Sequence, residues 1–166
     1  MIGNFERVSF RRTITALAAT CAMLAPFSAG AQDLPFKPPK GWVEVAVPKG
    51  LIGKWVQPGT DTFHQNLSVY AHTYSGTLAQ YYAIDIKSLK SHYPGGDLAV
   101  SQDTTVCGYH AAKYISYGLD TSAGALIIEQ MITVNNSVAY VVTYVRLASE
   151  ASDPAARQSM TTMCGI

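Results

Sequence analysis

The sequence lacks a large net charge of either sign: its formal net charge at pH 7 is +1. Its 166 residues include 12 basic and 11 acidic side chains, and charged residues make up only 14% of the chain. Proteins that bind nucleic acid or anionic membrane surfaces through electrostatics carry a clustered basic excess. The composition therefore argues against both kinds of partner.

The sequence also lacks the spaced motifs that mark common catalytic, cofactor and metal sites. It has no G-x-S-x-G nucleophile elbow, no G-x-G-x-x-G or Walker phosphate loop, and no C-x-x-C, H-x-H or H-E-x-x-H pattern. The four histidines, His64, His72, His92 and His110, are scattered along the chain. We therefore expect no metal and no cofactor, and the sequence alone assigns no catalytic residue.

Long hydrophobic runs are missing as well, and the nearest approach to one lies at the N-terminus. The run "TITALAATCAMLAPF" is too short to cross a membrane comfortably. Arg7, Arg11 and Arg12 precede it, and "SAGA", with alanines in an A-x-A arrangement, follows it. This order predicts a secretory signal peptide over residues 1–31, cleaved after Ala31, with a retained membrane anchor as the alternative.

The predicted signal peptide leaves the export route open. Arg11 and Arg12 before the apolar run are compatible with the twin-arginine route as well as the general secretory route. Removing residues 1–31 leaves 9 basic and 10 acidic residues, so the mature chain is also nearly neutral. We expect a periplasmic or secreted protein with no stable membrane insertion after cleavage.

Cysteine is scarce, with three in the whole chain. Cys21 leaves with the predicted signal peptide, so Cys107 and Cys164 remain. A single pair of cysteines in an exported protein is typical of a disulfide bond, because export takes the chain to an oxidising compartment. We predict a Cys107–Cys164 disulfide, with two free buried thiols as the alternative.

The first half of the mature chain contains strand patterns and then a helix pattern. Pro35, Pro38 and Pro39 favour an extended, non-helical segment over residues 32–40, and a single domain over 41–166 follows. Alternating apolar residues predict strands in "WVEVAV", "LIGKWVQP" and "NLSVYAHTY".

Helical spacing of apolar residues then predicts a helix over 77–92, with Thr77 or Ser75 as its N-cap. The sequence "PGG" at 94–96 ends it.

The second half again has strand patterns, over residues 97–147. Two long arms, "ALIIEQMITV" and "VAYVVTYVRL", flank Asn135, Asn136 and Ser137, which favour a tight hairpin turn. The second arm is nearly continuously apolar, which predicts a strand covered on both faces. A last helix is predicted from Pro154 to Cys164.

Three stretches carry a resemblance to a known family. "PKGW" at 39–42 opens the domain, "VCGYHAAKYISY" lies in its second half, and "EQMITVNNSVAYVVTYV" forms the long hairpin before a short C-terminal helix. Over residues 39–164 the chain resembles the PsbP-like fold family, which includes bacterial envelope proteins of the DcrB and LpqN type. The resemblance implies an antiparallel sheet flanked by helices, usually without enzymatic activity, in proteins that mostly act as binding or assembly factors.

The pattern and the resemblance agree on the fold class. We predict an α+β domain with an antiparallel sheet of about six or seven strands and two flanking helices, an α/β/α sandwich. Two acidic residues are expected to have structural positions. Asp85 should face solvent on the middle helix, and Glu129 should face outward or pair with Arg146 across the sheet. The alternative for Glu129 is a buried acid with a functional role.

Aromatic residues offer the best candidates for a partner or ligand surface. The chain has 10 Tyr, and tyrosine is common at interfaces because its ring is amphipathic. Ordinary packing on a half-buried sheet is the competing interpretation. The candidate surface consists of Trp55, Tyr109, Tyr114, Tyr117, Tyr140 and Tyr144.

These observations favour a non-enzymatic binding or assembly factor exported to the bacterial cell envelope. Its partner would be a protein or small molecule of the envelope. The alternatives are a small exported hydrolase with an unassigned site and a carrier of a small apolar ligand. A hollow with converging ionisable groups would favour the hydrolase, and a deep apolar cavity would favour the carrier.

Overall fold

The computed structural model describes residues 36–47, 49–59, 63–122 and 124–164. The predicted signal peptide and its cleavage site lie outside the described residues. Within them, seven strands form one antiparallel sheet, and two helices accompany it. The predicted α+β class, strand number and helix number are confirmed.

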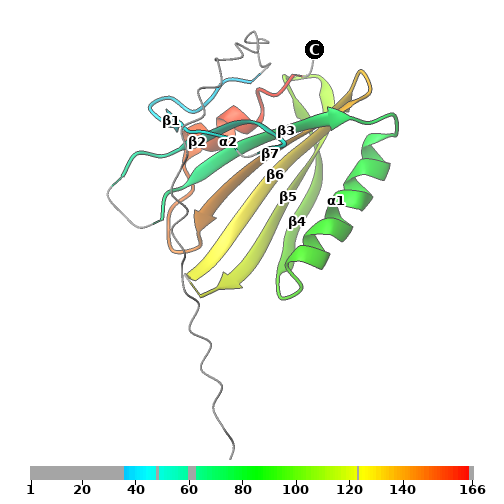
Figure 1. Cartoon of the computed structure of the whole chain (residues 1–166). Helices are drawn as coiled ribbons and strands as arrows, with labels where there is room; N and C mark the ends of the chain where they lie inside the picture. Colours follow the sequence, from blue (N-terminus) through cyan, green and yellow to red (C-terminus); the bar gives the residue numbers. More distant parts are fainter. Residues whose placement is uncertain (1–35, 48, 60–62, 123, 165–166) are drawn as a thin grey trace, which may run out of the picture. The chain divides into compact units, whose positions relative to one another are not determined.

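The strands follow the order β1-β2-β3-β7-β6-β5-β4 across the sheet (Figure 1). Strand β7 is central because it pairs with β3 on one side and with β6 on the other. This position explains its continuous apolar sequence, since a central strand is covered on both faces. The strand bounds are Val43–Glu44 (β1), Leu51–Val56 (β2), Asn66–Thr73 (β3), Asp97–Val106 (β4), His110–Thr121 (β5), Gly124–Asn135 (β6) and Val138–Leu147 (β7).

The β6–β7 hairpin turns over two residues. Asn135 pairs with Val138, and the residues between them, Asn136 and Ser137, have φ of 48° and 60°. Two consecutive positive φ values are the geometry of the tight turn that suits the twist of antiparallel strands. Asn adopts this conformation more readily than most residues, so the local sequence supports the predicted hairpin.

The first helix, α1 (Leu78–His92), lies against one face of the sheet (Figure 1). Thr77 caps it: the Thr77 hydroxyl accepts from the backbone N–H of Gln80, and the side-chain oxygen of Gln80 accepts from the backbone N–H of Thr77. Beneath the helix lie Ile115, Ile132 and Val141. We call this side of the sheet the α1 face.

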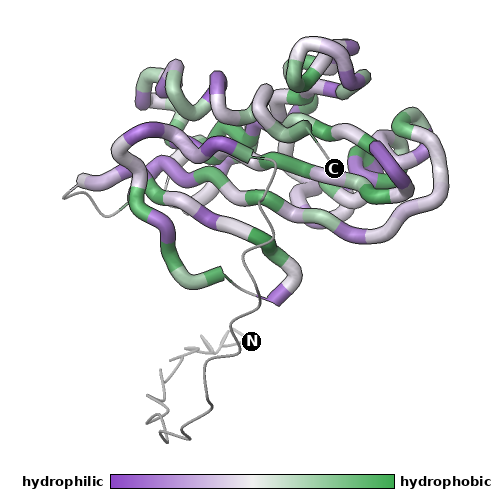
Figure 2. Tube along the Cα trace, turned by 90° about the horizontal axis from the view of Figure 1, so that it is seen from above, coloured by the Kyte–Doolittle hydropathy of each residue, from purple (hydrophilic) through white to green (hydrophobic). Residues whose placement is uncertain are grey.

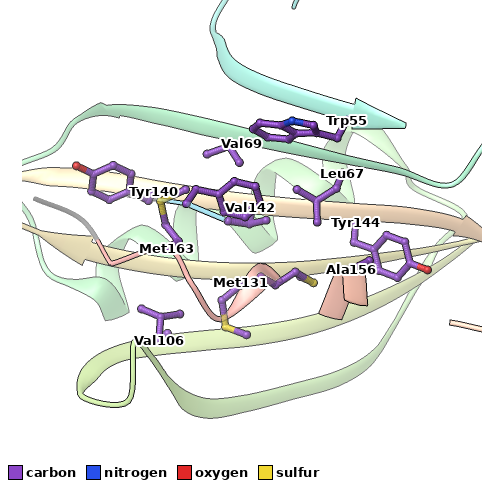
Figure 3. Close-up of a cluster of buried hydrophobic side chains, with 13 residues drawn as sticks. Trp55, Leu67, Val69, Val106, Met131, Tyr140, Val142, Tyr144, Ala156 and Met163 are labelled. Carbon is purple, nitrogen blue, oxygen red and sulfur yellow. The ribbon is translucent and has the colours of Figure 1, made fainter. Parts of the chain in front are cut away.

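The second helix, α2 (Pro154–Met160), packs on the opposite face, which we call the α2 face. Side chains from the strands gather there with Met163 of the C-terminal segment (Figure 3). Phe36 also joins this core from the Pro-rich segment. Along the strands, short hydrophobic and hydrophilic stretches alternate (Figure 2), as expected when successive side chains point to opposite faces.

Two elements are shorter than the sequence predicts. The first strand was expected over 42–47 but covers only Val43–Glu44. Trp42 packs against the core of the α2 face and donates its indole N–H to Asp153 Oδ2 at 3.0 Å. Val43 and Val47 on the other side are 52% and 43% exposed, so this side of the predicted strand has no core to cover.

The last helix was expected to reach Cys164 but ends at Met160. The Thr161 hydroxyl donates to the Gln158 carbonyl and the Thr162 hydroxyl donates to the Ser159 carbonyl. Threonine side chains that satisfy backbone groups in this way compete with helix continuation.

Candidate functional site

A hollow of about 390 Å³ opens on the α1 face, between α1 and strands β3, β6 and β7. Paired residues of neighbouring strands form the floor of the hollow: Tyr70 lies opposite Val141, and Gln130 lies opposite Thr143. Helix α1 supplies the wall. The lining residues are Tyr70, His72, Tyr81, Ile84, Asp85, Ser88, Gln130, Val141 and Thr143.

Three buried polar atoms on residues of this hollow have no hydrogen-bond partner: His72 Nδ1, Asp85 Oδ2 and Gln130 Oε1. Gln130 is only 8% exposed, and its Nε2 donates to Thr143 Oγ1 at 3.2 Å, which leaves the amide oxygen unpaired. A buried polar group without a partner costs about 1–3 kcal/mol, so native proteins have few of them. Three on the lining of one hollow need an explanation other than folding.

Aromatic rings line one side of the hollow. The ring centroids of Tyr70 and His72 are 5.0 Å apart, and those of His72 and Tyr81 are 5.3 Å apart. Tyr74 packs edge-on against Tyr81 at 5.0 Å. His72 is also in ring contact with Tyr74, so Tyr70, His72 and Tyr74 lie on one side of the chain.

Two groups at the hollow have shifted acidities. Burial raises the pKa of the Asp85 carboxyl to about 6. Burial, followed by the nearby charge of Asp85, raises the pKa of the Tyr81 hydroxyl to about 12. The expectation that Asp85 faces solvent is wrong: its Oδ2 atom is buried, because Asp85 is one helical turn from the buried Tyr81 and shares its face.

The α2 face holds a second polar cluster, centred on the fully buried Glu129. Arg157 binds the carboxylate with two nitrogens, at 2.9 Å and 2.8 Å, and the Tyr114 hydroxyl donates to it at 2.8 Å. Arg146 Nε lies 3.5 Å away, so the predicted pairing is confirmed. Sequence reasoning missed Arg157 because α2 reaches Glu129 only through the tertiary fold.

Paired charges determine the acidity of Glu129. Burial alone would raise the pKa of its carboxyl, but the hydrogen bonds from Arg157 and Tyr114 and the two guanidinium charges outweigh burial and lower the pKa. A hollow of about 250 Å³ lies beside Arg157 and Tyr114. Since both carboxylate oxygens already have charged partners, this cluster is explained by the anchoring of α2.

The candidate aromatic surface from the sequence is dispersed in the structure. Trp55, Tyr117, Tyr140 and Tyr144 are buried. Tyr114 is half-buried, with its hydroxyl donating to the Glu129 carboxylate, and Tyr109 is 73% exposed at the β4–β5 turn. Their contact with a partner stays a prediction, and Tyr109 is the member with a largely free ring.

The predicted disulfide is present and joins Cys107 to Cys164, with 5.4 Å between the Cα atoms. The Cys107 amide also donates to the Thr161 carbonyl at 2.8 Å. The bond thus fastens the segment after α2 to the β4–β5 turn. Such a bond is typical of oxidising, extracytoplasmic compartments.

The described part of the chain contains no group of three or more His, Cys, Asp or Glu residues placed to hold a metal ion. None of its helices has the length and apolar character needed to span a membrane.

Sequence comparison gives no relative from which to transfer a function. No protein-family model matches the chain, and no curated protein matches it. The informative comparisons are therefore with solved structures.

Several solved structures share the fold. LpqN of Mycobacterium tuberculosis, a protein involved in cell envelope biogenesis, aligns with a TM-score of 0.62 at 15% identity, over 76% of this chain and 78% of LpqN. A Pseudomonas aeruginosa protein of unknown function aligns with a TM-score of 0.59 at 15% identity, over 75% of this chain and 97% of its own.

Cyanobacterial PsbP (CyanoP) of Synechocystis sp. PCC 6803 aligns with a TM-score of 0.51 at 16% identity, over 68% of this chain and 74% of its own. At these identities the likeness establishes the fold alone. The resemblance to PsbP and LpqN is thereby confirmed: the chain has a PsbP-like fold.

Proposed function

We propose that this protein is an exported, non-enzymatic binding protein of the bacterial cell envelope, and that the hollow on the α1 face holds its ligand. The observation that carries the proposal is the set of three unpaired buried polar atoms on His72, Asp85 and Gln130. A small turn of these side chains would let a bound ligand satisfy them, since ligand sites combine apolar walls with a few polar groups that orient the ligand.

The proposed location has separate support. The Cys107–Cys164 disulfide suits an oxidising compartment. The N-terminal sequence has the charge and apolar pattern of a signal peptide. LpqN, which is involved in cell envelope biogenesis, has the same fold.

A small hydrolase is the second candidate, because two ionisable groups, His72 and Asp85, line one hollow. A catalytic base is normally oriented by a hydrogen bond and lies within reach of a nucleophile. His72 Nδ1 and Asp85 Oδ2 have no such bond, and the serine hydroxyl on the α1 wall, that of Ser88, contacts His92 at 3.3 Å. A carrier of apolar ligands fits less well, because polar residues line much of the hollow.

The test uses the exported protein purified from the periplasm of expressing cells. It would be immobilised and exposed to a small-molecule extract of the cell envelope, beside two variants with a bulky side chain on α1. Ser88→Trp places an indole at the hollow, whereas Lys87→Trp, one residue away on the same helix, places it at an exposed position outside the lining.

We expect the wild type and Lys87→Trp to retain an extract component that Ser88→Trp does not retain, as judged by mass spectrometry. Equal retention by all three proteins would contradict the assignment of the hollow. Turnover of a generic ester, glycoside or peptide substrate that is lost in His72→Gln would favour the hydrolase instead.

A further inference from the structure

The unpaired atoms of the hollow call for hydrogen-bond donors. An ionised carboxylate oxygen and an amide oxygen only accept hydrogen bonds, and these are the unpaired groups of Asp85 and Gln130. The amide nitrogen of Gln130 is already occupied by Thr143. The imidazole Nδ1 of His72 accepts in one of its two neutral tautomers. A ligand that satisfies this set must therefore donate.

The charge of the hollow calls for a cation. None of the nine described residues that line it is Lys or Arg, and Asp85 is its one carboxylate. A partly buried carboxylate without a counter-ion is costly, and a cation placed beside it removes most of that cost. An anionic ligand would add repulsion instead.

The walls supply a surface that favours an organic cation over a fully hydrated inorganic one. Tyr70 and Tyr81 contribute aromatic rings, whose faces attract ammonium and guanidinium groups. Ile84 and Val141 add apolar surface beside the polar groups. A volume of about 390 Å³ is at the small end of the range for small-molecule sites.

We propose that the hollow binds a small organic cation, an amine or guanidinium group on an apolar body. Asp85 Oδ2 and Gln130 Oε1 are buried, so a small turn of both side chains would bring them to the charged N–H groups, while the apolar body would lie along Tyr70 and Ile84. This inference rests on the proposed function, because it names the ligand class of the same site.

Binding of such a cation should depend on pH. Burial raises the pKa of Asp85 to about 6, and a bound cation favours its ionised form. Affinity should therefore increase as the pH rises through about 6. The other titratable groups facing the hollow are His72 and Tyr70 from β3 and Tyr81 from α1, whereas β6 and β7 contribute Gln130, Val141 and Thr143, which do not titrate.

The variants Asp85→Asn and His72→Gln separate the role of the carboxylate from that of the imidazole, because only the first removes the carboxylate.

The experiment compares probes that share one apolar body and differ in charge. 2-Phenylethylamine and phenylguanidine are cations, 2-phenylethanol is neutral and phenylacetate is an anion. Each would be titrated into the isotopically labelled exported protein, and binding would be followed by the NMR signals of Gln130, Thr143 and the α1 residues.

We expect a cationic probe to shift these signals with an affinity at least about 10-fold above that of 2-phenylethanol, as a charge-assisted contact gives. Phenylacetate should not bind. Asp85→Asn should weaken the cation at least about 10-fold and remove most of the pH dependence, whereas Lys87→Trp should bind as the wild type does.

The outcomes that overturn the inference differ from those that overturn the proposed function. Binding of the alcohol or the anion as tightly as the cations would keep the hollow as a ligand site and reject the cation. Cation-induced shifts that persist in Ser88→Trp, or the absence of any shift with both cations, would also reject it. Retention from the envelope extract still decides the proposed function in each of these cases.

Discussion

The two faces of the sheet handle polar side chains in opposite ways. On the α2 face, the buried carboxylate of Glu129 is fully paired with Arg157, Tyr114 and Arg146. On the α1 face, His72 and Asp85 line the hollow, and their atoms Nδ1 and Oδ2 are buried and unpaired. The first arrangement is explained by folding, and the second is not.

This difference has an energetic side. A buried ion pair with good geometry and satisfied oxygens is at least tolerated, and it positions α2 uniquely. Unpaired atoms on the α1 face lower stability, since each costs about 1–3 kcal/mol. Proteins keep such local costs mainly at functional sites. The α2 face should therefore govern stability, and the α1 face should govern binding.

Removing the disulfide on the α2 side should have the largest effect on stability. The double variant Cys107→Ser/Cys164→Ser should lower the free energy of unfolding by up to about 4 kcal/mol, because a bond across 57 residues restricts the unfolded chain. Urea unfolding measures this loss. Reduced wild-type protein is the control and should match the variant.

The same double variant should still bind the cationic probe under conditions in which it is folded. A loss of binding in the folded variant would mean that the two faces are coupled, and the comparison would fail.

The second prediction concerns the paired carboxylate itself. Glu129→Gln should lower the free energy of unfolding by about 3 kcal/mol, because it leaves the Arg157 and Arg146 guanidinium groups without their counter-charge. Asp103→Asn is the matched control: it also breaks an ion pair, with Lys113, but Asp103 is 84% exposed and the loss should stay below about 1 kcal/mol. Equal losses in the two variants would show that Glu129 does not anchor α2.

Much of the fold could be predicted because its signals are local. The helix over 77–92 follows from apolar spacing and a Thr77 cap, and the β6–β7 hairpin follows from two β-rich arms around Asn136. The disulfide follows from counting cysteines after the signal peptide. The end of α2 was misplaced because the hydroxyls of Thr161 and Thr162 bond to backbone carbonyls, a competition that propensity describes only weakly.

The hollow could not be predicted because it depends on long-range register. His72 and Gln130 are far apart in the sequence, and they reach one hollow only because β7 pairs with both β3 and β6. Asp85 shows what reasoning from one helix alone misses. A charged residue close to Lys87 is expected to face solvent, yet Asp85 lies one turn from Tyr81 and therefore on the helix face that lines the hollow. The four-residue spacing from Tyr81 is the signal that could have indicated burial.

A variant on the α1 face should change the free energy of unfolding in the opposite direction and by less. Asp85→Asn should raise the free energy of unfolding at neutral pH by about 2 kcal/mol, less than the full pKa shift would give because the side chain is partly exposed. Asn keeps the shape of the side chain but cannot ionise. The variant should therefore gain stability and lose cation binding together, unlike any variant on the α2 face.

The pH dependence of this gain follows from linkage. Burial raises the pKa of Asp85 from 3.8 in the unfolded chain to about 6, so between these values the folded protein binds more protons than the unfolded chain. The stability that Asp85 contributes therefore falls as the pH rises through this window and stays low above it. The advantage of Asp85→Asn over the wild type should grow from about pH 4 to about pH 6 and then stay constant.

Urea unfolding of both proteins measures this difference. The pH should range from 4.5 to 8, on the order of two units either side of the pKa of Asp85. Glu129, whose lowered pKa also makes stability depend on pH, is present in both proteins, so its contribution cancels. A difference that does not change with pH would mean that Asp85 is not desolvated in the folded protein. The charge argument for an organic cation in the hollow would then lose its basis, while the paired cluster on the α2 face would be unaffected.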